Sequence, residues 1–278
     1  MFNRDEYMKM LRETSDYLKQ QDFKNIKAAI ILGSGLNEIA EKFETLKIIN
    51  YSEIPNFLQT TVEGHKGRFV LAKFNNHKVL FMQGRFHYYE GYPMYRVVFP
   101  IRVFSLLSIN NLIVTNASGG INPNFKVGDV MIITDHIAFF MPENPLRGPN
   151  LDIFGPRFIS MQGAYDKKWI MKVKEKLGSN DSVKEGVYCM VPGPNYESPA
   201  ELNMLKIIGV DAVGMSTVPE VIVARHCGMK VIGFSVITDV VSEVVEHGVT
   251  HEEVLENTKR ASEIVEKLIR FALETVDE

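Results

Sequence analysis

The stretch that decides the fold is residues 193–239, GPNYESPAELNMLKIIGVDAVGMSTVPEVIVARHCGMKVIGFSVITD. It contains two helix starts, SPAE at 198–201 and TVPE at 217–220. Each has a hydroxyl residue at the N-cap, a proline in the first turn and a glutamate three residues after the cap, which together predict a capping box. The apolar run at 230–237 predicts a buried strand. Capped helices that alternate with apolar strands indicate an α/β fold.

The remaining apolar patterns predict a sheet with both parallel and antiparallel strands. The runs at 68–74 and 77–83 flank Asn75-Asn76 and predict a β-hairpin, which makes the sheet mixed. The sequence has no low-complexity linker and no internal repeat, so we expect a single domain over residues 1–278. The other predicted elements are helices at 5–20, 94–107 and 251–275 and strands at 28–32, 112–115 and 130–133.

Composition excludes several classes of function. The net charge of -3 and the lack of a Lys/Arg-rich block argue against a nucleic-acid partner. No apolar run approaches the roughly 20 residues of a membrane span, and the polar N-terminus is unlike a signal peptide, so we expect a cytoplasmic protein. The two cysteines, Cys189 and Cys227, lack the spacing of a zinc site or a disulfide framework, and we expect no metal.

Two segments carry groups suited to an anion. GSG at 33–35 ends a buried strand, and its N–H groups could hold phosphate, although such a turn is also common for purely structural reasons. GRFHYYEG at 84–91 places Arg85 and His87 on one side of extended chain, where a guanidinium and an imidazole suit an oxyanion. The alternative is a solvated arginine beside a packing histidine. We expect Glu90 to orient His87 and to favour its protonated form.

Further polar residues follow other predicted strands, where α/β proteins place ligand groups. NASGG at 116–120 combines an amide with glycines that allow close approach to the backbone. Ser216 precedes a helix whose free N–H groups favour an anion. Glu197 and Asp239 add two carboxylates, which suit the ring N–H groups of a heterocycle. The alternative for Glu197 is a helix cap beside Ser198, and the alternative for Asp239 is a turn cap.

These motifs resemble those of the trimeric class of purine nucleoside phosphorylases. The resemblance covers roughly residues 29–260 in unbroken order. It implies a partly barrel-like mixed sheet flanked by helices, and a reaction in which phosphate cleaves a purine nucleoside to free base and pentose 1-phosphate. It also implies a homotrimer with no metal or organic cofactor, because phosphate is a co-substrate. The matching motifs are GSG at 33–35, GH at 64–65, GRFH at 84–87, NASGG at 116–120, NPLRGPN at 144–150, GPNYE at 193–197 and GMSTVPE at 214–220.

The resemblance also implies roles for individual residues. Phosphate would be bound by Ser34, His65, Arg85, His87, the Ala117 backbone N–H and Ser216. The nucleoside would be bound by Tyr89, Asn116, Tyr196, Glu197, Val213, Met215, Thr238, Asp239 and His251, and by Phe158 reaching in from a neighbouring subunit. Of these residues, His87, Glu197 and Asp239 would act in catalysis.

One residue departs from the family pattern and keeps the base preference open. Enzymes of this family that act on 6-oxopurines usually have asparagine where this chain has Asp239. An ionised aspartate only accepts hydrogen bonds, so it favours the 6-amino group of adenosine, whereas a protonated one could donate to the O6 of inosine or guanosine. Glu197 suits the N1–H of hypoxanthine or guanine. The alternatives are a methylthioadenosine phosphorylase, against which His251 argues, and a nucleoside-binding protein without catalysis.

Overall fold

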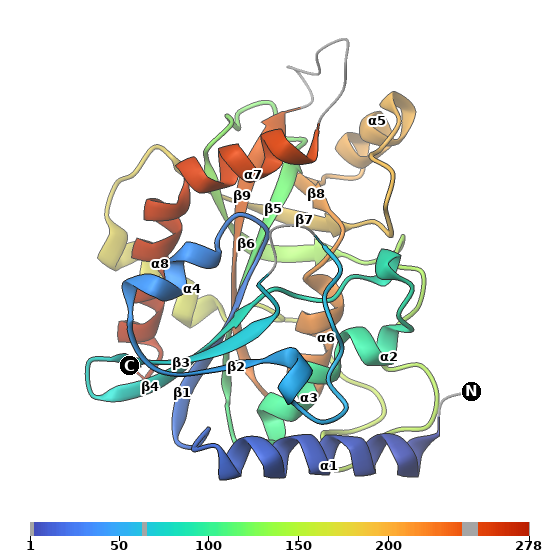
Figure 1. The fold of residues 1–278 in the computed structure, drawn as a ribbon. Helices are drawn as coiled ribbons and strands as arrows, with labels where there is room; N and C mark the ends of the chain where they lie inside the picture. Colours follow the sequence, from blue (N-terminus) through green and yellow to red (C-terminus); the bar gives the residue numbers. More distant parts are fainter. Residues whose placement is uncertain (1–2, 63–65, 241–249, 278) are drawn as a thin grey trace.

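A computed structural model describes residues 3–62, 66–240 and 250–277. Within these residues nine strands form one mixed sheet in the order β2-β3-β4-β1-β5-β8-β7-β6-β9. Helices α4 and α8 lie on one side of the sheet and α2, α3 and α6 on the other, with α1 across one end (Figure 1). The strands are β1 Ile26–Leu32, β2 Glu44–Asn50, β3 Arg68–Phe74, β4 His77–Gln83, β5 Asn111–Gly120, β6 Val130–Ile137, β7 Val183–Met190, β8 Ala212–Gly214 and β9 Lys230–Val240. The α-helices are α1 Arg4–Gln20, α2 Met94–Val97, α3 Phe99–Leu106, α4 Lys167–Leu177, α5 Pro199–Ile207, α6 Val218–His226, α7 His251–Arg260 and α8 Ser262–Thr275.

The sheet is partly closed, which confirms the expected partly barrel-like architecture. Strand β9 is antiparallel to β6 and also runs parallel to β5. Strands β5, β8, β7, β6 and β9 therefore form a ring, and β2, β3, β4 and β1 extend it as an open wing. The predicted hairpin is β3 and β4, which pair antiparallel from Arg68 with Gln83 to Phe74 with His77.

Two predicted helices are interrupted. The helix expected over 94–107 breaks at Val98 into α2 and α3, because Pro100 has no N–H to donate to the carbonyl four residues earlier. The helix expected over 251–275 breaks at Ala261. The two parts bury different amounts of surface: α7 buries only Thr258, whereas α8 buries six side chains against the rest of the protein.

The parallel part of the sheet places several strand ends together. Strand β1 is parallel to both β4 and β5, and β5 is parallel to β9, so the carboxyl ends of these four strands meet at one edge. Gly33, directly after β1, allows a close approach there, since a Cβ on it would lie 2.7 Å from the Asn116 Cα. The loops that follow these strands are therefore neighbours, as expected at the ligand edge of an α/β sheet.

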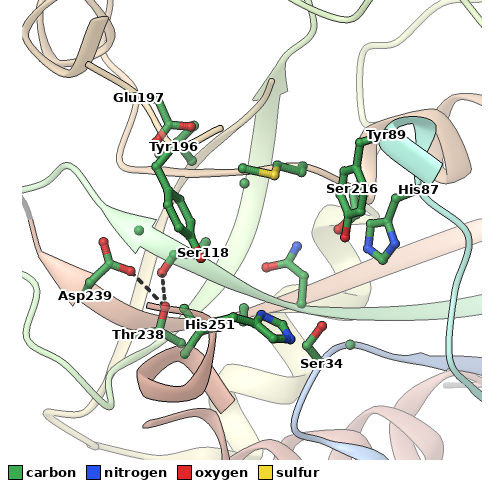
Figure 2. Close-up of a pocket in the computed structure, with 18 of the residues that line it drawn as sticks. Ser34, His87, Tyr89, Ser118, Tyr196, Glu197, Ser216, Thr238, Asp239 and His251 are labelled. Atoms are coloured by element: carbon green, nitrogen blue, oxygen red, sulfur yellow. Dashed lines mark hydrogen bonds between the residues drawn. The ribbon is translucent and has the colours of Figure 1, made fainter. Parts of the chain in front are cut away.

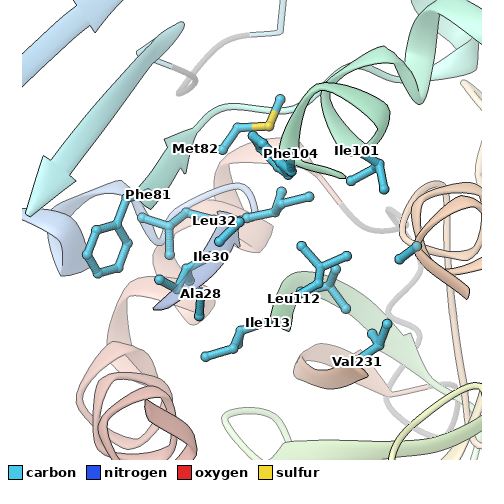
Figure 3. Packing of buried hydrophobic residues seen from close by; sticks show 14 of the residues in the cluster. Ala28, Ile30, Leu32, Phe81, Met82, Ile101, Phe104, Leu112, Ile113 and Val231 are labelled. Atoms are coloured by element: carbon cyan, nitrogen blue, oxygen red, sulfur yellow. The ribbon is translucent and has the colours of Figure 1, made fainter. Parts of the chain in front are cut away.

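Below that edge the strands are buried on both faces by apolar side chains. The packing is dense around β1 and β5 (Figure 3). Ala28, Ile30, Leu32, Phe81, Met82, Ile101, Phe104, Leu112, Ile113 and Val231 are each at most 1% exposed. In the described part of the chain, no helix has the length and apolarity that crossing a membrane requires.

Candidate functional site

A pocket opens at the shared carboxyl edge of β1, β5 and β9. It is concave and lined by both polar and apolar side chains, as small-molecule sites are. Figure 2 shows Ser34, His87 and Ser216 at one end and Tyr196, Glu197 and Asp239 at the other. The lining residues are Gly33, Ser34, Arg85, His87, Tyr89, Asn116, Ala117, Ser118, Gly119, Tyr196, Glu197, Val213, Gly214, Met215, Ser216, Thr238, Asp239, His251 and Val254.

The structure brings most of the predicted site residues into this one pocket. They come from the loops after β1, β4, β7 and β8, from strands β5, β8 and β9, and from the first residue of α7. Phe158 is different, since it is 88% exposed and does not line the pocket of its own chain. His65 lies outside the described residues. Ser118, Gly214 and Val254 also line the pocket and were not singled out from the sequence.

Arg85 is buried at the floor of one end and makes an ion pair that local sequence patterns did not predict. Its Nε and Nη2 donate to the two carboxylate oxygens of Glu220 at 3.2 and 2.7 Å. Its Nη1 donates to the Thr115 carbonyl at 2.6 Å and to Ser216 Oγ at 3.2 Å. The side chains of Arg85 and Glu220 are only 1% and 6% exposed. Such a fork-to-fork pair fixes the orientation of the guanidinium as well as its charge.

The second capping box predicted from the sequence, at Thr217 and Glu220, is therefore absent. Thr217 is the N-cap of α6, but its side chain makes no capping hydrogen bond, and Glu220 turns to Arg85 instead. The first predicted box is present: Ser198 Oγ accepts from the Glu201 N–H, and the Glu201 carboxylate accepts from the Ser198 N–H. A single carboxylate followed by four apolar residues, at 221–224, was the signal that could have revealed this buried partner.

His87 lies beside Arg85 and is oriented by Glu90, as expected. The His87 backbone N–H donates to Glu90 Oε1 at 2.7 Å, and its Nδ1 lies 3.2 Å from the same oxygen. The imidazole stacks on the Tyr89 ring with centroids 4.7 Å apart. Glu90 also favours the protonated imidazole, as expected, because its hydrogen bond and its charge both raise the pKa of His87. Burial lowers its pKa, and this effect outweighs the opposing effect of the Glu90 carboxylate.

The opposite end of the pocket carries two carboxylic acids, Glu197 and Asp239. Burial raises the pKa of Glu197, and the nearby charge of Asp239 raises it further. Burial likewise raises the pKa of Asp239, although a hydrogen bond with Thr238 offsets part of the shift. Glu197 does not cap α5, since Ser198 does. Two acids with raised pKa values facing one cavity are suited to exchanging protons with a bound heterocycle.

Thr238 links this acidic end to the strands below. Its Oγ1 lies 2.9 Å from Asp239 Oδ1 and 3.2 Å from the Ser118 carbonyl oxygen (Figure 2). A hydroxyl has one hydrogen, so it cannot donate fully to both acceptors. A proton on Asp239 would resolve the competition, because the acid could then donate to Thr238 while Thr238 donates to Ser118.

The centre of the pocket is formed by the amide of Asn116 on β5. Its Nδ2 donates to Thr217 Oγ1 at 2.8 Å, and its Oδ1 accepts a hydrogen bond from Ser235 on the neighbouring strand β9. His251, the first residue of α7, borders the same space. Among the described residues, no group of three His, Cys, Asp or Glu side chains is arranged to hold a metal ion.

Comparison with known proteins identifies relatives over nearly the whole chain. The sequence profile of the phosphorylase superfamily matches residues 27–274. A Bos taurus purine nucleoside phosphorylase is 47% identical over 272 residues, covering 95% of this chain and 94% of that protein. Purine nucleoside phosphorylase 1 of Bacillus subtilis is 46% identical over 262 residues, covering 94% and 96%. The solved structure of a Schistosoma mansoni purine nucleoside phosphorylase in complex with adenosine has a TM-score of 0.88 at 38% identity, covering 96% of this chain and 97% of that one.

The contacts of Glu90 predict a pH-dependent contribution to stability. Burial alone would raise its pKa, but hydrogen bonds from His87 and Thr61 outweigh burial and lower the pKa from 4.5 to about 2. A lowered pKa in the folded state stabilises the protein above pH 4.5, and this contribution is lost as the pH falls toward 2. In urea unfolding at stepped pH, Glu90→Gln should be less stable than wild type at pH 6, and the difference should shrink toward pH 2.

Glu175→Gln, on the exposed face of α4, is the matched control and should track the wild type throughout. A stability gap between wild type and Glu90→Gln that stays constant from pH 6 to pH 2 would contradict the assigned contacts.

Proposed function

We infer that this chain, which belongs to the phosphorylase superfamily, is a purine nucleoside phosphorylase. Phosphate and a purine nucleoside would give the free base and pentose 1-phosphate. The observation that carries this inference is the polarity of a single pocket, with Arg85 and His87 at one end and two carboxylic acids at the other. Identities of 46–47% to the Bos taurus and Bacillus subtilis enzymes over most of the chain support the same reaction.

The reaction needs two charges to be stabilised at once. A phosphate oxygen bonds to C1′ of the sugar as the C1′–N9 bond breaks, and the electron pair of that bond moves to the purine. The sugar gains oxocarbenium character, which the phosphate beneath it offsets, while the purine gains negative charge, which a proton at N7 neutralises. Both ends of the pocket are therefore required, and phosphate acts as a co-substrate and not as a cofactor.

The cationic end is suited to phosphate. Ser34, Arg85, His87 and Ser216 supply side-chain groups, and Ala117 would supply its backbone N–H. The glutamate-held guanidinium of Arg85 is presented in one orientation, which favours recognition of an oxyanion. A phosphate next to His87 adds the negative charge that favours the imidazolium over the neutral ring. His65 would also bind phosphate, as its sequence motif implies.

The remainder of the pocket is suited to the nucleoside. Tyr89, Met215 and His251 would surround the sugar, with His251 reaching the 5′-hydroxyl. Asp239 would donate the proton to N7, and Glu197 would bind the far edge of the base. The walls of the base site would be formed by Asn116, Tyr196, Val213 and Thr238.

A phosphate-dependent assay tests the reaction directly. Release of base from inosine, guanosine, adenosine and methylthioadenosine is followed with and without phosphate. We expect cleavage of inosine only when phosphate is present, with pentose 1-phosphate formed in equal amount. Cleavage without phosphate would indicate a hydrolase, and tight binding with no cleavage would indicate a binding protein. A strong preference for methylthioadenosine would indicate the alternative phosphorylase.

Asp239 is the residue that sets the choice of base, and we propose that it allows adenosine to be cleaved at a rate comparable with inosine. Burial raises the pKa of Asp239, and a proton on this acid would relieve the competition for the Thr238 hydroxyl. After donating that proton to N7, the carboxylate can accept a hydrogen bond from the 6-amino group of adenine. The related Schistosoma mansoni protein has been solved in complex with adenosine, which is in keeping with this proposal.

Asp239→Asn separates the two classes of purine. An asparagine can donate to O6 of inosine but does not replace the carboxylate that accepts from the 6-amino group. We expect the ratio of kcat/KM for adenosine over inosine to fall by about 5- to 150-fold, the range for loss of one buried hydrogen bond. If the wild type does not cleave adenosine and Asp239→Asn leaves this ratio unchanged, Asp239 does not determine the choice of base.

Phe158 supports a shared site in an oligomer. This side chain is 88% exposed and the neighbouring Ile153 is 62% exposed, although both are large and apolar. Contiguous exposed apolar surface commonly marks a site of contact with a partner. We propose that the protein is a homotrimer in which Phe158 closes the sugar end of a neighbour's pocket.

Phe158→Ala should weaken nucleoside binding while leaving the fold intact. We expect the KM for inosine to rise and the KM for phosphate to change little, because the ring would contact only the sugar. Phe139→Ala removes a phenylalanine that is 91% exposed and serves as the matched control. An active monomer in sedimentation analysis, or equal effects of the two substitutions, would contradict the shared site.

A further inference from the structure

The chain between β8 and α6 has an unusual backbone conformation at Thr217. Its φ of 75° and ψ of -54°, with the Val218 N–H donating to the Ser216 carbonyl at 2.8 Å, define a γ-turn with positive φ. This turn is rare and strained, and a β-branched residue is especially unfavourable in it. Strain of this kind persists only where the surroundings enforce it, and it concentrates at functional sites.

The surroundings that enforce the turn are a short chain of buried polar groups. Thr217 Oγ1 accepts from Asn116 Nδ2 at 2.8 Å, and Asn116 Oδ1 accepts from Ser235. Ser235 Oγ lies in turn 2.6 Å from Ser118 Oγ. These four side chains are at most 4% exposed, and Asn116 and Ser235 are direct partners in the parallel ladder between β5 and β9. The turn is therefore held by side chains of the paired strands β5 and β9.

The turn sets the position of groups on both of its sides. Ser216, before it, has its Oγ 3.2 Å from Thr217 Oγ1 and within hydrogen-bond distance of Arg85 Nη1. Glu220, after it, holds the other side of the Arg85 guanidinium. A relaxed backbone at Thr217 would rotate Ser216 relative to α6. Ser216 and Glu220 could then no longer both contact the Arg85 guanidinium.

We propose that Thr217 is a positioning residue for phosphorolysis, acting through the hydrogen bond from Asn116. The bond holds the strained turn, and the turn aims Ser216 and Arg85 at the phosphate. Thr217 itself contacts neither the phosphate nor the sugar in this scheme. The inference rests on the proposed function for its kinetic consequence, but its effect on phosphate binding can be measured without catalysis.

The test compares three variants with the wild-type protein. Thr217→Val keeps the shape and removes the hydroxyl, Thr217→Ser keeps the hydroxyl, and Ser235→Ala removes the donor to Asn116. Phosphate affinity is measured by calorimetry, and the KM values for phosphate and inosine and kcat are measured by base release. Unfolding temperature monitors the fold.

We expect Thr217→Val to weaken phosphate binding by about 5- to 100-fold, since one lost hydrogen bond also misplaces neighbouring groups. The KM for inosine should change much less, Thr217→Ser should restore phosphate binding to within a few-fold of wild type, and Ser235→Ala should show the same split in milder form. Ser235→Ala also provides the test if Thr217→Val does not fold.

Equal losses for phosphate and inosine, or wild-type phosphate affinity in both Thr217→Val and Ser235→Ala, would overturn the proposal. A wild type that binds phosphate but does not cleave nucleosides would refute the proposed function alone, and calorimetry would still decide the role of Thr217.

Discussion

The site depends on one buried ion pair, Arg85 with Glu220. A buried charge is tolerated only when it is paired and hydrogen-bonded, and removing one partner of such a pair typically costs about 3–5 kcal/mol. The two residues are 135 positions apart, and their pairing ties the loop after β4 to the first turn of α6. Ser34 and His87 lie near this anchor because β1 and β4 end at the same edge of the sheet, whereas Ser216 follows β8, which runs antiparallel to β5. The pair thus fixes where an anion can be held, while the sheet fixes what surrounds it.

The two ends of the pocket carry different ionisable groups, and this difference suits the reaction. At one end Glu220 balances the charge of the buried Arg85 guanidinium, so Arg85 is not an uncompensated buried cation. At the other end, burial raises the pKa values of Glu197 and Asp239, which shifts both acids toward their protonated forms. Negative charge that develops on a departing purine would meet these protons, while the sugar cation would lie over the phosphate. In the proposed reaction, charge separation would be stabilised at both ends by groups that are in place before the substrate binds.

The sequence predicted the features that local patterns control. The hairpin at 68–74 and 77–83, the helix at 5–20 and the capping box at Ser198 all depend on neighbouring residues, and all are present. The same box at Thr217 failed because Arg85, distant in sequence, competes successfully for Glu220. The strand predicted at 112–115 continues through the NASGG segment, because that segment pairs with β9 as far as Gly120. The pKa of His87 also required the structure, since burial and Glu90 act in opposite directions.

A crystal structure of the protein with phosphate and adenine bound together would test the division of the pocket most directly. The account predicts phosphate within hydrogen-bond distance of Ser34, His87 and Ser216, with the purine ring between Glu197 and Asp239. The N7 atom of the purine should face the Asp239 carboxyl group. Phosphate bound at the acidic end, or adenine bound outside the space between Glu197 and Asp239, would contradict it.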